Sequence, residues 1–204
     1  MTHVVTPSEV NPITAGQIGK VQDLLGAALR KAGLQSEPMQ QVIEHQGEAL
    51  IAELVAAVRK RVEAISSMIV RHVAINVERT PQQVLDATGR KQYVNGDVVV
   101  TMPCGTTPEA DVHFFKLDRC VSDDDLEKEY ELRGLKPADP RSLAAVNEAD
   151  PAFADEHPNS THWKDVNGNW CYAAFNRWFD GGRSVYVHRF DLWFDGSWFA
   201  GLRK

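Results

Sequence analysis

The first 92 residues contain no phenylalanine, tryptophan or tyrosine, and the first aromatic residue of the chain is Tyr93. In contrast, residues 163–204 hold 12 of the 17 aromatic residues. Because large aromatic side chains dominate the packing of most cores, a segment without them must be built differently from one that is rich in them. We therefore expect two parts with different interiors.

Several signals of other protein classes are also missing. The three cysteines are an odd number without CxxC spacing, which predicts reduced thiols rather than a disulfide framework or a zinc site. No apolar run approaches about 18 residues, so no membrane span is expected. The N-terminus lacks the charged and apolar regions of a secretion signal. The cellular location is therefore unknown, with the cytoplasm as the default expectation. The net charge of −6 argues against a nucleic-acid-binding protein, which needs a basic face.

Residues 1–69 are predicted to be helical. Thr14 and Gln17 have the spacing of a capping box, and apolar residues then recur at helical intervals. A second start signal at Ser36 opens a longer run with the same period. We expect an antiparallel hairpin of two helices. Its narrow apolar stripe resembles a heptad seam and needs a cover, either the rest of the chain or another subunit, so this segment is a candidate for homo-oligomerisation.

Residues 70–204 mix strand and helix signals, which predicts the α+β class for the whole chain. Strands are expected at 70–77, 98–102 and 112–117, and helices are expected from Thr80 to about Gly89 and from Ser122 to about Leu132. Residues 135–162 are predicted to be mostly loop with one short helix. The C-terminus returns to short strands, with turns at Gly168 and Gly181.

No motif for catalysis or for metal binding stands out. His157, His162 and His188 have aspartates nearby, but their spacing matches no metal-site template. Cys171 lies between two aromatic residues, where a packed thiol is expected rather than a nucleophile. The run that begins at Asp123 is explained by the preference of acidic residues for helix starts. We therefore expect no catalytic residue, no metal and no cofactor.

The segment 184–194 alternates between two sets of residues. The first set is framework-like and contains Val185 and Val187. The second set has no common size, charge or polarity: Ser184, Tyr186, His188, Phe190, Leu192 and Phe194. Side chains two apart on an extended strand share a face. The irregular set is therefore expected to be displayed together, while the two valines face inward.

The composition of the same region has a gap. Residues 172–203 contain no Glu, Gln, Lys or Met, where the chain average predicts about five. Every residue type of the irregular set can be encoded by a codon that ends in a pyrimidine, whereas Glu, Gln, Lys, Met and Trp cannot. This pattern fits the randomisation of asparagine AAY codons at their adenines, with the third base left unchanged.

The C-terminal block resembles the variable proteins of diversity-generating retroelements. The similarity lies in the run from Trp170 to Phe175, in the scattered Arg, Asp and Trp framework, and in the closing run from Trp198 to Arg203. In this family an error-prone reverse transcriptase substitutes at the adenines of a template repeat. The resemblance implies a C-type-lectin-like fold, of the formylglycine-generating-enzyme branch, that displays variable residues on a rigid scaffold. The helical N-terminal part departs from the simplest members.

The resemblance also indicates which residues vary. The region about 176–197 carries twelve candidate ligand-binding residues: Asn176, Phe179, Gly181, Gly182, Ser184, Tyr186, His188, Phe190, Leu192, Phe194, Gly196 and Ser197. The three tryptophans between residues 178 and 198 are assigned to the scaffold, because an AAY codon cannot become a Trp codon by adenine substitution alone. The alternative for the apolar members, Phe190, Leu192 and Phe194, is a place in the core.

These observations favour a non-enzymatic binding protein. Rigid aromatic side chains with small neighbours are typical of antibody paratopes, and an exposed apolar cluster suits a macromolecular ligand, which we expect to be a protein. One alternative is an enzyme on a formylglycine-generating-type scaffold. The oxidative enzymes of that branch need a cysteine pair, and only Cys171 lies in the C-terminal block. A second alternative is a structural protein that assembles through its helices, which could coexist with binding.

Overall fold

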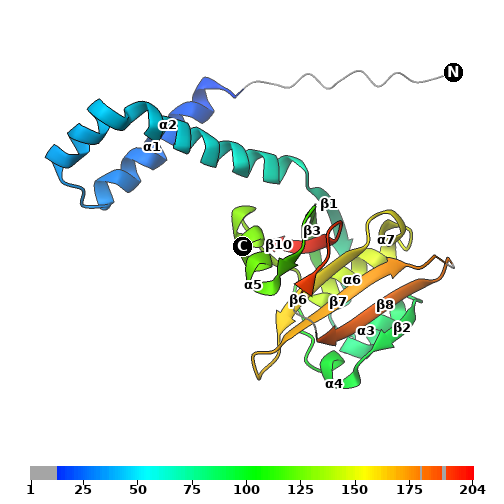
Figure 1. Cartoon of the computed structure of the whole chain (residues 1–204). Coiled ribbons are helices and arrows are strands. Elements are labelled where there is room, and N and C mark those ends of the chain that lie inside the picture. Colours follow the sequence, from blue (N-terminus) through cyan, green and yellow to red (C-terminus); the bar gives the residue numbers. More distant parts are fainter. Residues whose placement is uncertain (1–12, 180, 190–191) are drawn as a thin grey trace, which may run out of the picture. The chain divides into compact units, whose positions relative to one another are not determined.

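The computed structural model describes residues 13–179, 181–189 and 192–204 (Figure 1). The chain divides into two compact units, Met1–Ala56 and Ala57–Lys204. It contains helices and a mixed sheet and therefore belongs to the α+β class, as predicted. Among the helices of the described residues, none combines the length and the apolarity that crossing a bilayer would require.

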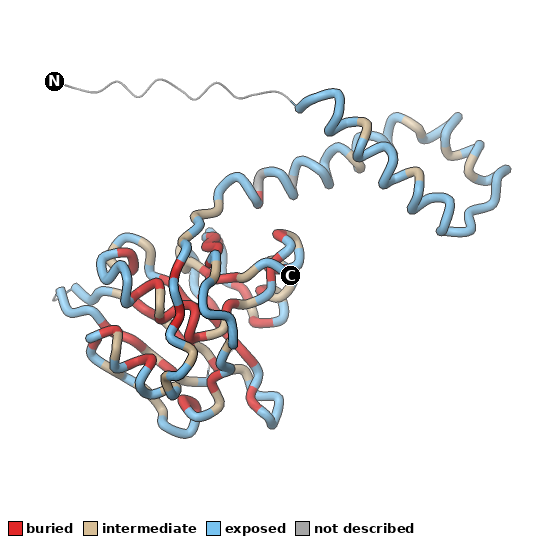
Figure 2. Tube along the Cα trace, turned by 180° about the vertical axis from the view of Figure 1, so that it is seen from behind, coloured by how far each residue is buried: buried red, intermediate tan, exposed pale blue. Residues whose placement is uncertain are grey.

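Two long helices occupy the N-terminal part, as the sequence predicts. Helix α1 (Ala15–Lys31) begins with the expected capping box between Thr14 and Gln17. A turn at Gly33, whose φ of 64° suits glycine, leads into α2 (Ser36–Ser66). No residue of α1 is buried. Figure 2 shows that α1 and most of α2 are coloured as exposed.

The second unit is built on one large sheet with the strand order β1-β3-β10-β6-β7-β8-β2. Its strands are β1 (Ile69–Ala74), β2 (Lys91–Val94), β3 (Glu109–Lys116), β5 (Leu135–Pro137), β6 (Asn159–Lys164), β7 (Trp170–Arg177), β8 (Arg183–Arg189) and β10 (Trp198–Arg203). Strand β5 pairs with β10, the pairs β10–β6 and β2–β8 are parallel, and the other pairs are antiparallel. A small second sheet joins β4 (Val121–Ser122) to β9 (Leu192–Trp193).

Among the described residues that follow α2, there are five shorter helices: α3 (Pro81–Ala87), α4 (Gly96–Val99), α5 (Asp123–Leu132), α6 (Pro140–Ala149) and α7 (Phe153–Glu156). The predicted starts of α3 and α5 are confirmed, because Thr80 and Ser122 accept hydrogen bonds from backbone N–H groups three residues further on. The strand predicted at 98–102 is wrong. Asn95 caps α4 there, and the valines of this helix are buried.

The prediction that residues 135–162 are mostly loop is also wrong. This stretch contains β5, α6, α7 and the beginning of β6. Asp139 caps α6 and Pro140 occupies its first turn. Hydrophobic alternation in the sequence does not reveal strand β6, because this strand begins with four buried polar residues: Asn159, Ser160, Thr161 and His162. Hydrogen bonds to buried partners, and not apolarity, hold this strand in place.

The main core lies on one side of the sheet, where α6 packs on β1, β3 and β6, and α7 packs on β7. Strands β7 and β8 contribute Cys171, Ala173, Phe175, Val185 and Val187, all fully buried. A second apolar cluster includes Phe115, Leu126, Tyr130, Trp193 and Phe199. In the part of the chain that the structure describes, no helix covers the other face of β7, β8 and β2 (Figure 1).

Candidate functional site

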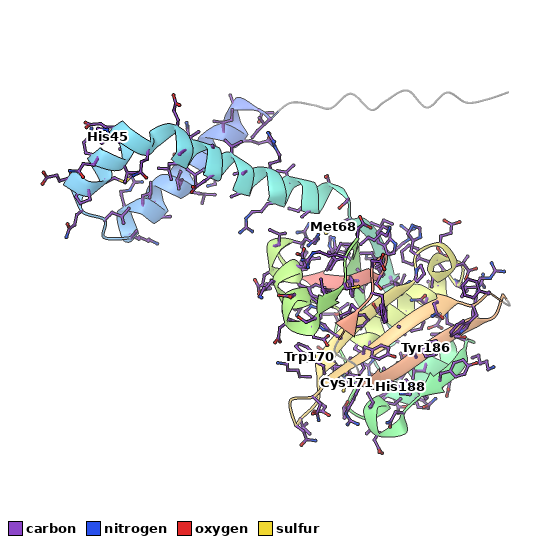
Figure 3. The ribbon with its side chains drawn as sticks, in the orientation of Figure 1. His45, Met68, Trp170, Cys171, Tyr186 and His188 are labelled. Carbon is purple, nitrogen blue, oxygen red and sulfur yellow. The ribbon has the colours of Figure 1, made fainter. Side chains whose placement is uncertain are left out.

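The face of β7 and β8 that points away from the main core carries the candidate site, which we call the outer face. The antiparallel register places three pairs on it: Tyr172 opposite His188, Ala174 opposite Tyr186, and Asn176 opposite Ser184. The parallel strand β2 adds Tyr93 beside Tyr186. The strand period therefore brings Tyr186 and His188 of β8 onto one surface (Figure 3), and it places Ser184 on the same side of the sheet.

Aromatic contacts fix the centre of the outer face. The rings of Tyr93 and Tyr186 stack with centroids 5.1 Å apart and planes inclined by 7°. On the other side, the edge of Trp178 meets Tyr186 at 6.2 Å, and the Trp178 Nε1–H donates a hydrogen bond of 2.5 Å to the Tyr186 hydroxyl. A tyrosine held from both sides loses little conformational entropy when it binds a ligand. These contacts restrict the ring of Tyr186.

A small pocket adjoins this surface. It has a volume of about 250 Å³. It is lined by Pro158, Asn159, Ser160, Tyr172, Ala174, Phe175, Asn176, Trp193, Phe194 and Ser197. Three of these residues, Asn176, Phe194 and Ser197, are predicted variable positions. Within the described residues, no hydrogen-bond donor reaches the buried Oδ1 of Asn176. The walls of the pocket are mostly apolar.

Four predicted variable residues are exposed as expected: Phe179, Gly181, Gly182 and Phe194. Phe179 is fully exposed just beyond the end of β7, and the side chain of Phe194 is 62% exposed. The core alternative therefore does not apply to Phe194. Tyr186 and His188 are half-buried. Phe190 lies outside the described residues, and so does the side chain of Leu192, whose backbone belongs to β9.

Other predicted positions are less free than the sequence suggests. Ser184 is only 1% exposed, which corrects the expectation that it is displayed with its neighbours. It lies on a central strand between Asn176 of β7 and Lys91 of β2, so the two adjacent strands limit its exposure. Gly181 and Gly196 have φ values of 84° and 77°, where any residue with a Cβ is strained.

The tryptophans assigned to the scaffold differ among themselves. Trp193 is buried and Trp198 is half-buried, which suits a scaffold role. Trp178 is 47% exposed and contacts Tyr186, so it lies at the candidate site and not in the core. The codon of a residue limits which substitutions adenine mutation can make there, but it does not determine whether the side chain is exposed.

A buried polar network, which the sequence did not reveal, holds the segment that carries Phe194. Asp123 Oδ1 accepts hydrogen bonds from His162 Nδ1 and, at 3.0 Å, from Trp193 Nε1. His162 Nε2 lies 2.9 Å from Glu127 Oε1. Asp123 is therefore more than a helix-start charge. It connects α5, β6 and β9, and it positions one wall of the pocket.

The charges of this network shift two pKa values. Burial alone lowers the pKa of His162, but its hydrogen bonds and ion pairs with Asp123 and Glu127 outweigh burial and raise it above the usual 6.5. The hydrogen bond from His162 in turn lowers the pKa of Glu127. Trp170 stacks on the imidazole with ring centroids 4.5 Å apart. His162 thus has a carboxylate at each ring nitrogen, and these two charges favour its protonated form.

A larger pocket of about 650 Å³ lies beside this network, lined in part by His162, Glu127, Lys164 and Trp170. It is the kind of concave, charged site that an enzyme would need. The carboxylates of Asp123 and Glu127 face the two ring nitrogens of His162, and the side chain of Glu127 is 42% exposed.

The cysteines do not assemble into a reactive site. Cys171 is fully buried, and burial raises the pKa of its thiol. It faces the main core, whereas His188 lies on the outer face opposite Tyr172. Cys104 and Cys120 are exposed free thiols. Among the described residues, no group of three or more His, Cys, Asp or Glu side chains could hold a metal ion.

Comparisons with protein families, with curated proteins and with solved structures find no match to this chain.

Proposed function

We propose that this chain is a variable ligand-binding protein of the diversity-generating retroelement type, with a C-type-lectin-like second unit that presents the outer face to a protein ligand. One coincidence carries the proposal. Within β8, the framework residues Val185 and Val187 are fully buried, and the irregular residues Tyr186 and His188 lie on the outer face. The same region lacks Glu, Gln, Lys and Met. Diversification would thus act on the face that the core does not need.

The chemistry of the outer face supports binding to a protein. Tyr186 and its partners Tyr93 and Trp178 supply rigid aromatic area, which is typical of binding hot spots. The adjoining pocket of about 250 Å³ is smaller than the roughly 300–1,000 Å³ of small-molecule sites. It suits a single side chain of a larger partner.

The DNA around the gene tests this proposal. We expect a nearby repeat that matches codons 176–197 and differs from them mainly where the repeat has adenine, together with a reverse transcriptase gene. Sequencing of related isolates should find substitutions at the same codons and no substitutions at the codons of Val185 and Val187. A neighbourhood without repeat and reverse transcriptase, or substitutions spread evenly over both faces, would refute the proposal.

The alternative function is an enzyme on a formylglycine-generating-type scaffold, and the pocket beside His162 and Glu127 is the observation in its favour. Such an enzyme would need His162 to exchange protons with a substrate. Nitrogen NMR of the imidazole separates the two functions. If His162 is a catalytic base, its Nε2 loses its proton near the pH at which a free histidine does. If His162 only joins Asp123 and Glu127, both of its ring nitrogens stay protonated at a higher pH than in a free histidine.

We also propose that the N-terminal helices form a hairpin that joins copies of the chain. Ile18, Val21 and Leu25 recur at helical spacing on α1, and each is more than a third exposed. Apolar rows of this kind are normally covered in the assembled protein. Light scattering should therefore give a multiple of 22.7 kDa, and a species of 22.7 kDa alone would reject this assembly.

A further inference from the structure

The C-terminal half of α2 carries a row of β-branched residues that the described chain leaves uncovered. They are Ile51, Val55, Val58, Val62 and Ile65, with exposed fractions of 58%, 51%, 41%, 59% and 45%. Their spacings along the helix are four, three, four and three residues. This spacing defines a single straight stripe on one side of α2, which we call the α2 stripe.

The α2 stripe has the pattern of a coiled-coil seam. With a three-residue step from a to d, Val55 and Val62 occupy a positions, and Ile51, Val58 and Ile65 occupy d positions. A seam of this kind packs its side chains into holes on an identical helix. Because every seam residue is β-branched, the stripe also carries information on how many helices meet.

We propose that the α2 stripe forms a parallel three-stranded coiled coil with two further copies of this chain. The inference rests on the self-association proposed above and adds its stoichiometry and direction. A two-stranded coil favours β-branched residues at a with leucine at d, whereas β-branched residues at both positions favour higher order. The four-stranded pattern has leucine at a, and here both a residues are valines.

The flanking charges set the direction. Arg59 is an e residue and Arg61 is a g residue, and both are exposed. In a parallel coil, g residues meet the e residues of the next heptad, so Arg61 faces Ser66 and Leu54 faces Arg59. An antiparallel alignment that buries the same stripe brings Arg59 of one copy close to Arg59 of the next. Repulsion between these guanidinium groups therefore favours the parallel coil.

A parallel trimer has a consequence for binding. In each copy the large sheet begins with β1, directly after the C-terminal end of α2, and in a parallel coil these three ends coincide. Three identical outer faces would then act on one multivalent ligand. Linked sites can gain about 10²–10⁴ in avidity without any new contact, so a weak variable surface becomes useful.

Sedimentation equilibrium of the full chain tests the stoichiometry. We expect three times 22.7 kDa. The variant Val58→Glu places a charge in the middle of the seam and should reduce the mass to that of a monomer. The matched control Ala57→Glu introduces the same charge at an exposed neighbouring position outside the stripe, and it should remain trimeric. Unchanged thermal unfolding of the second unit would verify that both variants fold.

A second variant tests the reason for the number three. The triple substitution Ile51→Leu, Val58→Leu and Ile65→Leu keeps the seam apolar but gives it the two-stranded pattern, so the mass should fall to twice 22.7 kDa. For direction, Ile65→Cys with Cys104 and Cys120 changed to serine should cross-link readily on oxidation, because residues 65 share a layer only in a parallel coil.

The outcomes separate the proposals. A wild-type dimer or tetramer overturns the trimer and leaves self-association intact, whereas a wild-type monomer overturns both. A trimer that survives Val58→Glu overturns the role of the α2 stripe. Absence of cross-linking through residue 65 overturns the parallel direction. None of these results changes the expectation of a template repeat near the gene, which tests the variable surface by itself.

Discussion

The two faces of the β7–β8 ribbon differ in what they do, although they share one backbone and one set of interstrand hydrogen bonds. The inner face consists of fully buried residues: Cys171, Ala173, Phe175, Val185 and Val187. The outer face mixes aromatic, imidazole, amide and small side chains that are mostly half-exposed. Because successive side chains of a strand point to opposite faces, one set of residues can stabilise the fold while the other set is available for binding. Changing one face therefore leaves the packing of the other largely intact.

The largest effect is expected on the inner face. Phe175→Ala removes a fully buried ring from the main core and should cost about 3–5 kcal/mol of unfolding free energy. Tyr186→Ala on the outer face removes a ring of similar size that is only half-buried. It should cost clearly less, about 1 kcal/mol. Urea denaturation of both variants measures the difference, and equal losses would show that the outer face also carries the fold.

The second effect tests the network that supports the outer face from below. His162→Gln leaves Asp123 and Glu127 without their buried cation and should cost about 3 kcal/mol. The loss reaches Trp193, because its indole shares the Asp123 oxygen with His162. We expect the indole N–H resonance of Trp193 to shift in this variant, whereas Phe175→Ala should leave its hydrogen bond in place. A stability close to that of the wild type would argue against the network.

The pH dependence of stability tests the contribution of His162 by itself. The folded protein binds the His162 proton more tightly than the unfolded chain does, since folding raises this pKa above 6.5. The stabilisation is therefore fully present below pH 6.5 and is lost as the pH rises through the folded-state pKa. Melting temperatures should fall over this window more steeply in the wild type than in His162→Gln. Parallel curves for the two proteins would contradict the assignment.

Local signals in the sequence predict much of this architecture. Thr14, Thr80 and Ser122 cap helices where expected, because a cap depends on residues a few positions away. The inward orientation of Val185 and Val187 follows from alternation alone. The sequence also locates the candidate surface on β8, although whether that surface is diversified stays a prediction.

Long-range contacts account for what the sequence does not predict. His162 and Asp123 lie 39 residues apart and share no pattern. Tyr93 reaches Tyr186 only through a parallel pairing of β2 with β8. The burial of Ser184 likewise depends on that pairing. Composition and spacing describe one strand at a time, so they cannot report which strand becomes its neighbour.

Ser184 differs from its neighbours, because it belongs to the predicted variable set and yet is buried. Ser184→Tyr forces a ring into a closely packed position and should cost about 1–3 kcal/mol. The matched control is His188→Tyr, which introduces the same side chain on the same face of β8 but at a half-buried position. If both variants unfold at the same urea concentration, Ser184 is as free to vary as its neighbours.

The smallest effect is expected where the chain leaves the outer face. Phe179 is fully exposed, so Phe179→Ser should change the unfolding free energy by no more than about 0.5 kcal/mol. Its neighbour Trp178 donates to the Tyr186 hydroxyl, and Trp178→Ser should cost about 1 kcal/mol and loosen the Tyr186 ring. Thermal unfolding measures the first difference and Tyr186 ring NMR the second. If Trp178→Ser and Phe179→Ser had the same stability and the same Tyr186 ring motion, Trp178 would not support the outer face. The distinction between fixed and variable residues would then end with β7.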